Sequence, residues 1–262
     1  MELIDTALVD HVMTITLNDE PRRNALSAQM LSELMEAIDV AERDDDVRVV
    51  VLTNRGTTFC SGANLAEQSS TRPPAGGATV EFYELLRRIR TSPKVFVGRL
   101  NGHCVAGGVG LAAVTDVSVA IETATFGFSE VRLGVVPAVI AVVCLPKMRR
   151  GDAQSAFLRG NRFSAGEAVR LGLITTSVAP DDLDREVDAV VNDILAGEPH
   201  ALGAVKLLTS SLPSMSEEEA IAWTAELSST FFRSEAAQAG MRAFLEKRPA
   251  PWVTRSEANG AT

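Results

Sequence analysis

Alternating and periodic apolar positions predict a strand, a helix and a second strand at the start of the chain. Residues 11–17 alternate apolar and polar side chains, and residues 47–52 form a β-branched run, both typical of β-strands. Between them Ser27 can cap a helix. The apolar face of that helix has the 3.6-residue period and comprises Leu31, Leu34, Met35, Ile38 and Ala41.

The same order of elements returns further along. Residues 81–89 read as a helix, residues 95–100 as a strand, and a glycine-rich turn leads into a small-residue helix that ends near Val114. Residues 117–121 read as the next strand. Strands that alternate with helices predict an α/β domain.

The second half of the chain is predicted to be mostly helical. Ser164 and Glu167 form a capping-box pattern, and residues 173–178 are one last short strand. The helices expected after it are 180–195, 200–208, 216–233 and 236–247, followed by a tail from Pro249 with too little apolar content to fold alone. We therefore expect an α/β core over residues 1–195 and a helical region over 196–262, within a single functional unit. The apolar faces of these late helices can pack against another subunit or close the core of their own subunit.

Composition and charge narrow the functional class. The chain of 262 residues carries 25 basic and 34 acidic side chains, a net charge of −9, and only 5% aromatic residues. It lacks the basic field and the stacking surfaces that nucleic acids require, so no nucleic-acid partner is expected. The apolar run 133–145 is too short to span a bilayer, and no secretory signal is visible. Its three cysteines have no metal-type spacing and are typical of reduced thiols in a cytosol. We therefore expect a cytoplasmic protein without membrane association.

Several common catalytic motifs are missing from the sequence. It contains no GxxxxGK[ST], HExxH, CxxC or GxSxG pattern, and its three histidines are scattered at positions 11, 103 and 200. Neither a metal site nor a serine–histidine–aspartate triad is therefore predicted, and we expect His103 to have a structural role. Gly108, Gly110 and Ala113 match a dinucleotide-binding pattern. The pattern begins eight residues after Leu100 instead of directly after the strand, so a dinucleotide site is not expected.

Two glycine-containing turns are the first candidate site. Residues 101–110 hold four glycines in ten positions, and residues 59–65 form a second turn after the strand 47–52. Glycine allows close approach of the backbone to a ligand, and free N–H groups in such turns can bind a developing oxyanion. The alternative is that both turns serve only close packing.

The second candidate is Glu130, which lies among apolar residues before an unusually hydrophobic stretch. Desolvation would raise the pKa of this carboxyl and suit it to proton transfer near neutral pH. The alternatives are an ion pair with Arg132 and a carboxylate that stabilises a helix start.

Together these segments resemble the enoyl-CoA hydratase/isomerase family, the crotonase superfamily. The resemblance rests on RNALS at 23–27, VRVVVLT at 47–53, FCSGA at 59–63, NG at 101–102 with AGG at 106–108, FG at 126–127 with Glu130, LG at 133–134 with Pro137, EA at 167–168 with LGL at 171–173, and AFLEKR at 243–248. It implies a spiral of β-β-α units, C-terminal helices that build homotrimers or hexamers, and an acyl-CoA thioester substrate. No metal and no separate cofactor are implied, because coenzyme A is part of the substrate.

The resemblance also implies roles for individual residues. The N–H groups of Ala63 and Gly107 would form the oxyanion hole, with Glu130 as the acid and base. Coenzyme A would be lined by Ala25, Ser61, Ala63, Leu65 and Gly107, and Phe244 and Lys247 would reach its adenine and phosphates from the same or a neighbouring subunit. Residues 68–79 are expected to form a mobile loop beside the site.

The sequence departs from the family pattern where a second acid is usual. Hydratases of the best-known kind carry a glutamate three residues after the position of Gly107, and here that residue is Gly110. Ser129 replaces a usual proline. A lone glutamate resembles the Δ3,Δ2-enoyl-CoA isomerases, whereas the segment around Glu130 is similar to hydratases of branched or carboxylated enoyl-CoAs. Three hypotheses follow: a hydratase-like lyase with one glutamate, an isomerase, and a non-catalytic acyl-CoA-binding protein.

Overall fold

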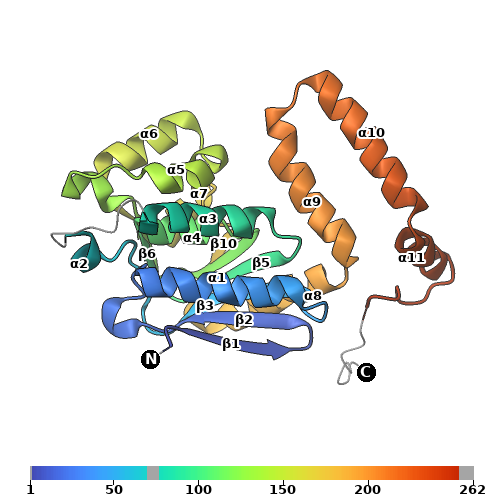
Figure 1. Cartoon of the computed structure of the whole chain (residues 1–262), viewed down its shortest axis with the longest axis horizontal. Coiled ribbons are helices and arrows are strands. Elements are labelled where there is room, and N and C mark those ends of the chain that lie inside the picture. Colours follow the sequence, from blue (N-terminus) through green and yellow to red (C-terminus); the bar gives the residue numbers. More distant parts are fainter. Residues whose placement is uncertain (1, 70–76, 254–262) are drawn as a thin grey trace.

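The computed structural model describes residues 2–69 and 77–253, which form a layered α/β body with helices α9–α11 lying to one side of it (Figure 1). The strands are β1 (Ile4–Val9), β2 (Val12–Leu17), β3 (Val49–Asn54), β4 (Thr58–Cys60), β5 (Val95–Leu100), β6 (His103–Val105), β7 (Val117–Ile121), β8 (Thr125–Gly127), β9 (Arg162–Ser164) and β10 (Thr176–Val178). The α-helices are α1 (Ala28–Arg43), α2 (Leu65–Gln68), α3 (Gly77–Thr91), α4 (Gly107–Ala113), α5 (Ala138–Cys144), α6 (Arg150–Arg159), α7 (Ala165–Arg170), α8 (Leu183–Leu195), α9 (Pro199–Ser211), α10 (Glu217–Arg233) and α11 (Glu235–Leu245). Short 3-10 turns are η1 (Glu20–Arg22), η2 (Ser129–Leu133), η3 (Leu145–Lys147), η4 (Pro180–Asp182) and η5 (Leu212–Ser214).

The strands of the described residues are divided between two sheets. The larger has the order β1-β2-β3-β5-β7-β10, and the smaller has the order β4-β6-β8-β9. Strands β3, β5 and β7 of the larger sheet are each followed directly by β4, β6 and β8 of the smaller one, and then by helical structure. This repetition is the predicted α/β spiral of β-β-α units, and the fold class is confirmed.

The short strands of the second sheet are the main difference from the sequence prediction. The glycine-containing segments 59–65 and 101–110 were expected as turns, but each includes residues of a short strand, β4 and β6 respectively. Strands of three residues are too short for an alternating pattern to be recognised. The apolar run 133–145 extends from the last residue of η2 through α5 to the first residue of η3, and the strand expected over 173–178 is shortened to β10. Part of the loop expected at 68–79, residues 70–76, lies outside the described residues.

The core explains why β3 reads as a continuous apolar run. Val50 and Leu52 belong to the main cluster beneath α1, while Val49 and Val51 belong to a second cluster beneath α8. Both faces of β3 are therefore buried, as is usual for a central parallel strand. Ser27 caps α1 by accepting a hydrogen bond from the N–H of Met30, as predicted.

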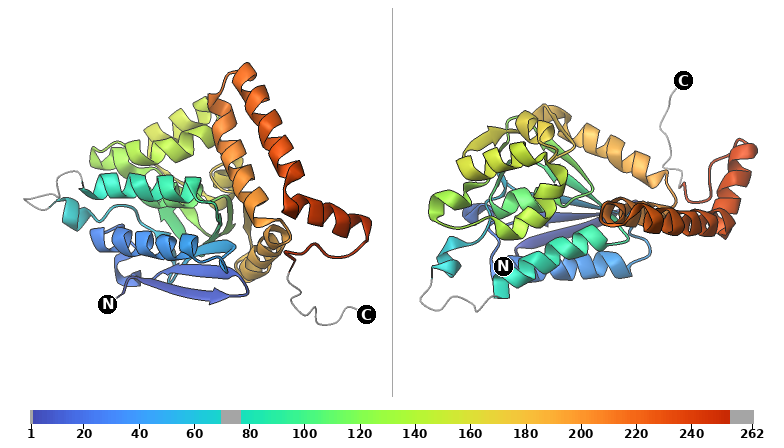
Figure 2. Two further views of the ribbon diagram at one scale, coloured as in Figure 1. Left: turned by 45° about the vertical axis from the view of Figure 1, so that its right-hand side comes forward. Right: turned by 90° about the horizontal axis from the view of Figure 1, so that it is seen from above.

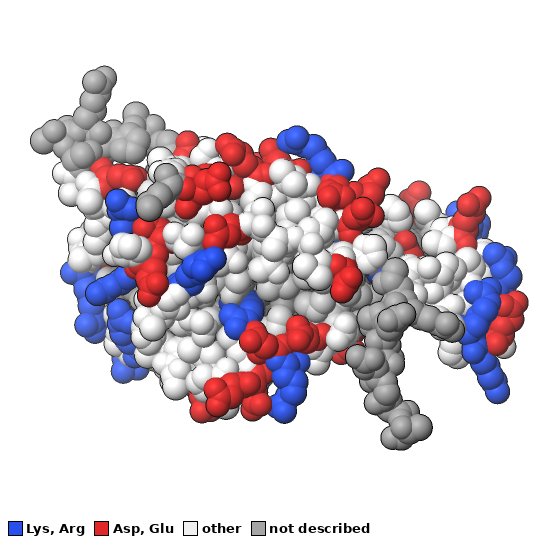
Figure 3. Space-filling view, turned by 90° about the horizontal axis from the view of Figure 1, so that it is seen from below, with Lys and Arg blue, Asp and Glu red and all other residues white. Residues whose placement is uncertain are grey.

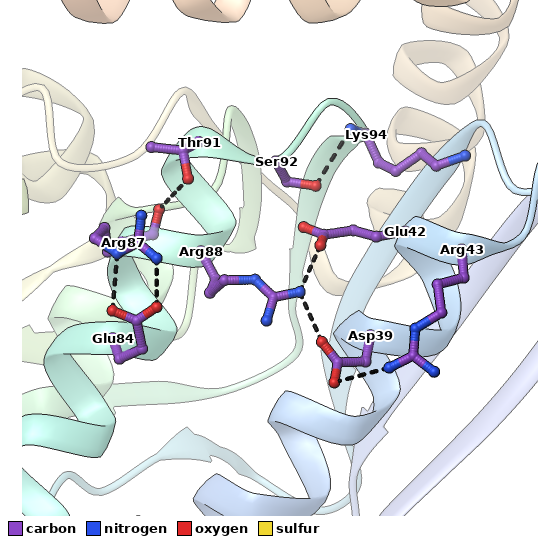
Figure 4. Close-up of polar contacts among 9 residues, drawn as sticks. All are labelled: Asp39, Glu42, Arg43, Glu84, Arg87, Arg88, Thr91, Ser92 and Lys94. Carbon is purple, nitrogen blue, oxygen red and sulfur yellow. Dashed lines mark hydrogen bonds and ion pairs between the residues drawn. The ribbon is translucent and has the colours of Figure 1, made fainter.

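Helices α1 and α3 are connected by ionic contacts (Figure 4). The guanidinium of Arg88 on α3 donates to Asp39, at 2.7 Å, and to Glu42, both on α1. The contact with Arg88 lowers the pKa of the Asp39 carboxyl. Because α3 carries Phe82, this attachment fixes a side chain that contacts the candidate site described below.

Two cationic side chains, the first of them buried, attach the C-terminal helices to the α/β body. Lys206 of α9 is 8% exposed and donates from Nζ to the carbonyls of Ile89 and Lys94, with Asp116 at 2.8 Å. Arg48 donates to the carbonyls of Leu195, Gly197 and Trp252. The segment after α11, up to residue 253, is therefore held to the body through Trp252. Figure 2 shows this segment running back beside α11.

The surface seen from below carries acidic and basic side chains interspersed with broad uncharged areas (Figure 3). No helix within residues 2–69 and 77–253 has the length and apolar character needed to cross a membrane.

Candidate active site

The carboxyl ends of three parallel strands place the candidate segments side by side. In the smaller sheet Cys60 of β4 pairs with Cys104 of β6, and Val105 of β6 pairs with Gly127 of β8. Residues 61–63, 106–107 and 128–130 follow directly at the same end of these strands. The sheet therefore gathers the first turn, the second turn and Glu130 into one site.

The first turn is held open by pairing with the segment before α1. The N–H of Leu26 donates to the carbonyl of Gly62 at 2.8 Å, and the N–H of Asn64 donates to the carbonyl of Leu26 at 3.3 Å. This bridge places Leu26 opposite Ala63 without using the N–H of Ala63. Among the residues that the structure describes, that N–H has no hydrogen-bond acceptor.

The second turn leads into α4 through an unusual backbone conformation. Ala106 has a φ of +51°, and its N–H donates to the carbonyl of Gly127 at 2.8 Å. Gly107 is the first residue of α4, and its N–H is likewise without an acceptor within the described parts of the chain.

The two turns are in direct contact. A Cβ atom placed on Gly62, whose φ is +89°, would lie 3.0 Å from the nitrogen of Gly107. A Cβ placed on Gly107 would lie 3.3 Å from the Cα of Gly62. The backbones touch because neither residue has a side chain, and Ala63 directly follows Gly62, so the N–H groups of Ala63 and Gly107 belong to the touching parts of the two turns.

Glu130 is held at the start of η2, next to a firmly packed aromatic residue. The ring of Phe128 is fully buried and lies 4.1 Å, centroid to centroid, from that of Phe157 on α6. Glu130 itself is half-buried, and within the described residues its Oε2 is buried without a hydrogen-bond partner. Burial raises the pKa of the Glu130 carboxyl. Of the two alternative roles, the ion pair is not formed, since Arg132 donates to the carbonyl of Arg159, whereas Glu130 does occupy the first turn of η2.

Gly110 is covered by hydrocarbon. A Cβ at this position would lie 2.3 Å from Cγ2 and 2.7 Å from Cβ of Ile140, which is 2% exposed on α5. No larger side chain fits there unless Ile140 moves. The position that the resemblance associates with a second glutamate is therefore closed in this chain.

Three apolar residues contact the site, and none of them was given this role from the sequence. Ile140 covers Gly110, while Leu26 and Phe82 have atoms 3.0 Å and 3.3 Å from the Cβ position of Gly107. Phe82 lies on α3 and Ile140 on α5, while Leu26 precedes α1. Their roles depend on contacts between distant segments, so no local signal could have identified them.

The predicted coenzyme-binding residues fall into two groups. Ala25, Ser61, Ala63 and Leu65 lie together in the first turn, its partner segment and the start of α2. Phe244 and Lys247 lie at and just after the end of α11, at the opposite end of the molecule from α2 (Figure 1). One chain does not bring these two groups together.

The remaining candidates have structural contacts. The Nδ1 atom of His103 accepts the N–H of Thr125 at 3.0 Å, across the pair of strands β6 and β8. No group of three or more histidine, cysteine, aspartate or glutamate side chains within the described ranges is arranged to hold a metal ion.

Comparisons with known proteins agree with one another. The sequence model of the enoyl-CoA hydratase/isomerase family matches residues 9–255. A putative enoyl-CoA hydratase of Thermus thermophilus is 36% identical over 245 residues, covering 91% of this chain and 96% of the relative. The 1,2-epoxyphenylacetyl-CoA isomerase of Escherichia coli is 29% identical over 254 residues, covering 95% of this chain and 97% of the relative. A crystal structure of enoyl-CoA hydratase from Mycobacterium smegmatis has a TM-score of 0.92 at 31% identity, covering 97% of this chain and all of that one (100%).

Proposed function

Because the chain belongs to the enoyl-CoA hydratase/isomerase family, we propose that it adds water reversibly to the double bond of a 2-enoyl-CoA thioester, with Glu130 as its general acid and base. Members of this family act on acyl-CoA thioesters. The proposal is supported by one observation: Gly62 and Gly107 touch, so that the free N–H groups of Ala63 and Gly107 belong to adjoining turns, at the same sheet end as Glu130, whose Oε2 has no hydrogen-bond partner among the described residues. No separate cofactor is required, because coenzyme A is part of the substrate.

In this proposal the two N–H groups donate to the thioester carbonyl oxygen. They stabilise the negative charge that develops there and make C3 electrophilic. Glu130 removes a proton from water while the hydroxyl oxygen bonds to C3, and the same carboxyl then delivers the proton to C2. Burial moves the pKa of Glu130 towards neutral pH, and a carboxyl with such a pKa can both take up and release a proton efficiently.

The contact between Gly110 and Ile140 favours a second candidate, a Δ3,Δ2-enoyl-CoA isomerase. In that reaction Glu130 removes a proton from C2 of a 3-enoyl-CoA and returns it to C4, so the double bond moves into conjugation. One carboxylate is sufficient, and no second group is needed to hold water. A third candidate is acyl-CoA binding without catalysis.

A pair of substrates separates the three candidates. We expect a product heavier by one water from a 2-enoyl-CoA, measured by mass spectrometry over a panel of chain lengths. Conversion of a 3-enoyl-CoA to its 2-enoyl isomer, without change of mass, instead supports the isomerase. Saturable binding of acyl-CoA with no turnover of any thioester supports the non-catalytic protein.

We also propose that α10 and α11 associate with neighbouring copies to form a trimer or hexamer. Large apolar side chains on these helices face solvent, with Ile221 63%, Phe232 64% and Phe244 82% exposed. A groove of about 710 Å³ beside them is lined by Phe231, Met241 and Trp252 among others. Such exposure is unusual on a monomer. Phe244 and Lys247 would then reach coenzyme A bound to a neighbouring chain.

Sedimentation of the full chain tests this assembly and should give three or six times the chain mass. Replacing Phe244 by alanine should raise KM for the thioester about tenfold, the loss expected for one aromatic contact with a base, and leave kcat unchanged. A monomeric mass contradicts the assembly, and an unchanged KM contradicts the contact with coenzyme A.

A further inference from the structure

The side-chain amide of Asn54 connects the chain segments that lead into the two glycine turns. Asn54 is the last residue of β3 and is 5% exposed. Its Nδ2 donates to the carbonyls of Gly56, at 3.0 Å, and Thr58, at 3.3 Å, in the connection from β3 to β4. The same amide donates to the carbonyl of Asn101 at 3.1 Å and accepts its N–H at 3.1 Å, in the connection from β5 to β6.

A second buried amide, that of Asn24, connects the segment before α1 to the start of β4. Asn24 is fully buried, and its Nδ2 donates to the carbonyl of Thr58 at 2.8 Å. Its Oδ1 accepts the N–H of Asp19 at 2.8 Å. Asn24 lies two residues before Leu26, the residue that pairs with Ala63. The carbonyl of Thr58 is thus shared by the amides of Asn24 and Asn54.

These contacts matter because β4 and β6 are too short to fix their own register. Each has three residues, and their pairing is irregular between Thr58 and Cys60. A slip of one residue moves one strand by about 3.3 Å relative to the other. Two N–H groups must both lie close to 3 Å from a single oxygen to stabilise its charge. A slip would therefore separate Ala63 from Gly107 as donors to one carbonyl.

We propose that Asn54 is a positioning residue that sets the Ala63 and Gly107 N–H groups at the spacing one thioester oxygen requires. It attaches the beginnings of both short strands to one buried amide at the end of β3. This inference rests on the proposed function, since it assigns the two N–H groups to a thioester carbonyl. Asn54 touches neither the substrate nor the reacting atoms and acts only through the two turns.

Two ligands that differ only at the carbonyl give the test. Butyryl-CoA presents a thioester oxygen, whereas its thioether analogue S-butyl-CoA has a methylene group in that place. We expect the wild type to bind butyryl-CoA more tightly in calorimetry. In Asn54→Ala the ratio of the two dissociation constants should fall towards one. The variant should also lower kcat by about 10²-fold on the enoyl thioester that the wild type converts, which is the loss typical of one misplaced donor. Binding of the thioether should change by less than about threefold.

Thr53→Val is the matched control. Thr53 precedes Asn54 in the same strand, is 7% exposed, and donates from Oγ1 to the carbonyl of Arg99 at 2.9 Å within the larger sheet. Its loss should lower the melting temperature but leave the preference for thioester over thioether intact. Asn54→Ser, which keeps a single donor, should be intermediate and provides a second variant where the alanine variant does not fold.

A spectroscopic readout separates positioning from general destabilisation. The infrared carbonyl frequency of ¹³C-labelled butyryl-CoA should fall on binding to the wild type and fall less in the Asn54 variants. Asn54 variants that keep the wild-type frequency and ligand preference, while only melting earlier, overturn the inference and leave the proposed function standing. A wild type that binds neither ligand contradicts the proposed function and the inference together.

Discussion

Replacing Glu130 by glutamine is expected to lower kcat by about 10³-fold, within the range of ~10²–10⁴ that one acid–base group contributes. Glutamine has nearly the same shape but cannot take a proton from water or from C2. Because Oε2 of Glu130 is buried without a partner in the described structure, no hydrogen bond to that atom is lost. The measurement is steady-state turnover of the thioester that the wild type converts. Glu122→Gln, on an exposed residue after β7, is the control. A kcat within tenfold of the wild-type value contradicts the role of Glu130.

The pKa of Glu130 also determines how the activity of the wild type, and the difference in stability between the wild type and Glu130→Gln, should change with pH. Burial raises this pKa, so the wild type should lose kcat/KM as the pH falls through a value above the ordinary range for glutamate. A carboxyl with a raised pKa binds its proton more tightly in the folded than in the unfolded state, so its ionisation destabilises the fold as the pH rises. Glu130→Gln should therefore melt at a higher temperature than the wild type at pH 7, and this difference should vanish in acid, below the unfolded-state pKa. Thermal unfolding at several pH values measures it.

Replacing Gly108 by alanine should have the second large effect, because the backbone of β4 occupies the space that a side chain needs. A Cβ at Gly108 would lie 2.1 Å from the carbonyl oxygen of Cys60 and 2.7 Å from the carbonyl carbon of the same residue. Backbone atoms cannot rotate away, so the start of α4 must move off β4 and carry Gly107 away from Ala63. We expect kcat to fall by at least about 10²-fold. The free energy of unfolding should fall by about 1–3 kcal/mol or more, as for other overpacked cores.

Gly151→Ala is the matched control for this effect. Gly151 lies in α6, and a Cβ there would meet nothing within 4 Å. The same substitution should raise the free energy of unfolding by about 0.5–1 kcal/mol, because alanine favours a helix over glycine, and leave kcat unchanged. Chemical denaturation and turnover of both variants provide the comparison. If Gly108→Ala behaves like Gly151→Ala, the close contact between α4 and β4 is not required for activity.

Much of the architecture could be predicted because it depends on local pattern. The helix after Ser27, the strand at 95–100 and the strand at 117–121 follow from side-chain period and capping, and the structure confirms them. The turn glycines and Glu130 could also be identified as candidates, because glycine spacing and an isolated carboxylate are visible along the chain. The second sheet could not be predicted, since strands of three residues such as β4 and β6 depend on pairing with each other.

The partners of each candidate residue also had to come from the structure. Gly108 and Gly110 are two glycines of one small-residue helix, and local pattern says nothing of what each of them contacts. One leaves space for the backbone of Cys60, and the other leaves space for the side chain of Ile140. The first contact holds α4 against the strand that leads to Ala63, and the second fills the place of another acid.

The sequence by itself therefore determined the α/β class, the candidate turns and the single carboxylate, because period, capping and residue type act over a few neighbouring positions. Only the tertiary structure decided that Gly62 and Gly107 touch, that the Asn54 amide connects the two segments leading into the turns, and that Ile140 closes Gly110. These features join residues about 30 to 50 positions apart, and they arise from packing between elements whose relative placement no local pattern specifies.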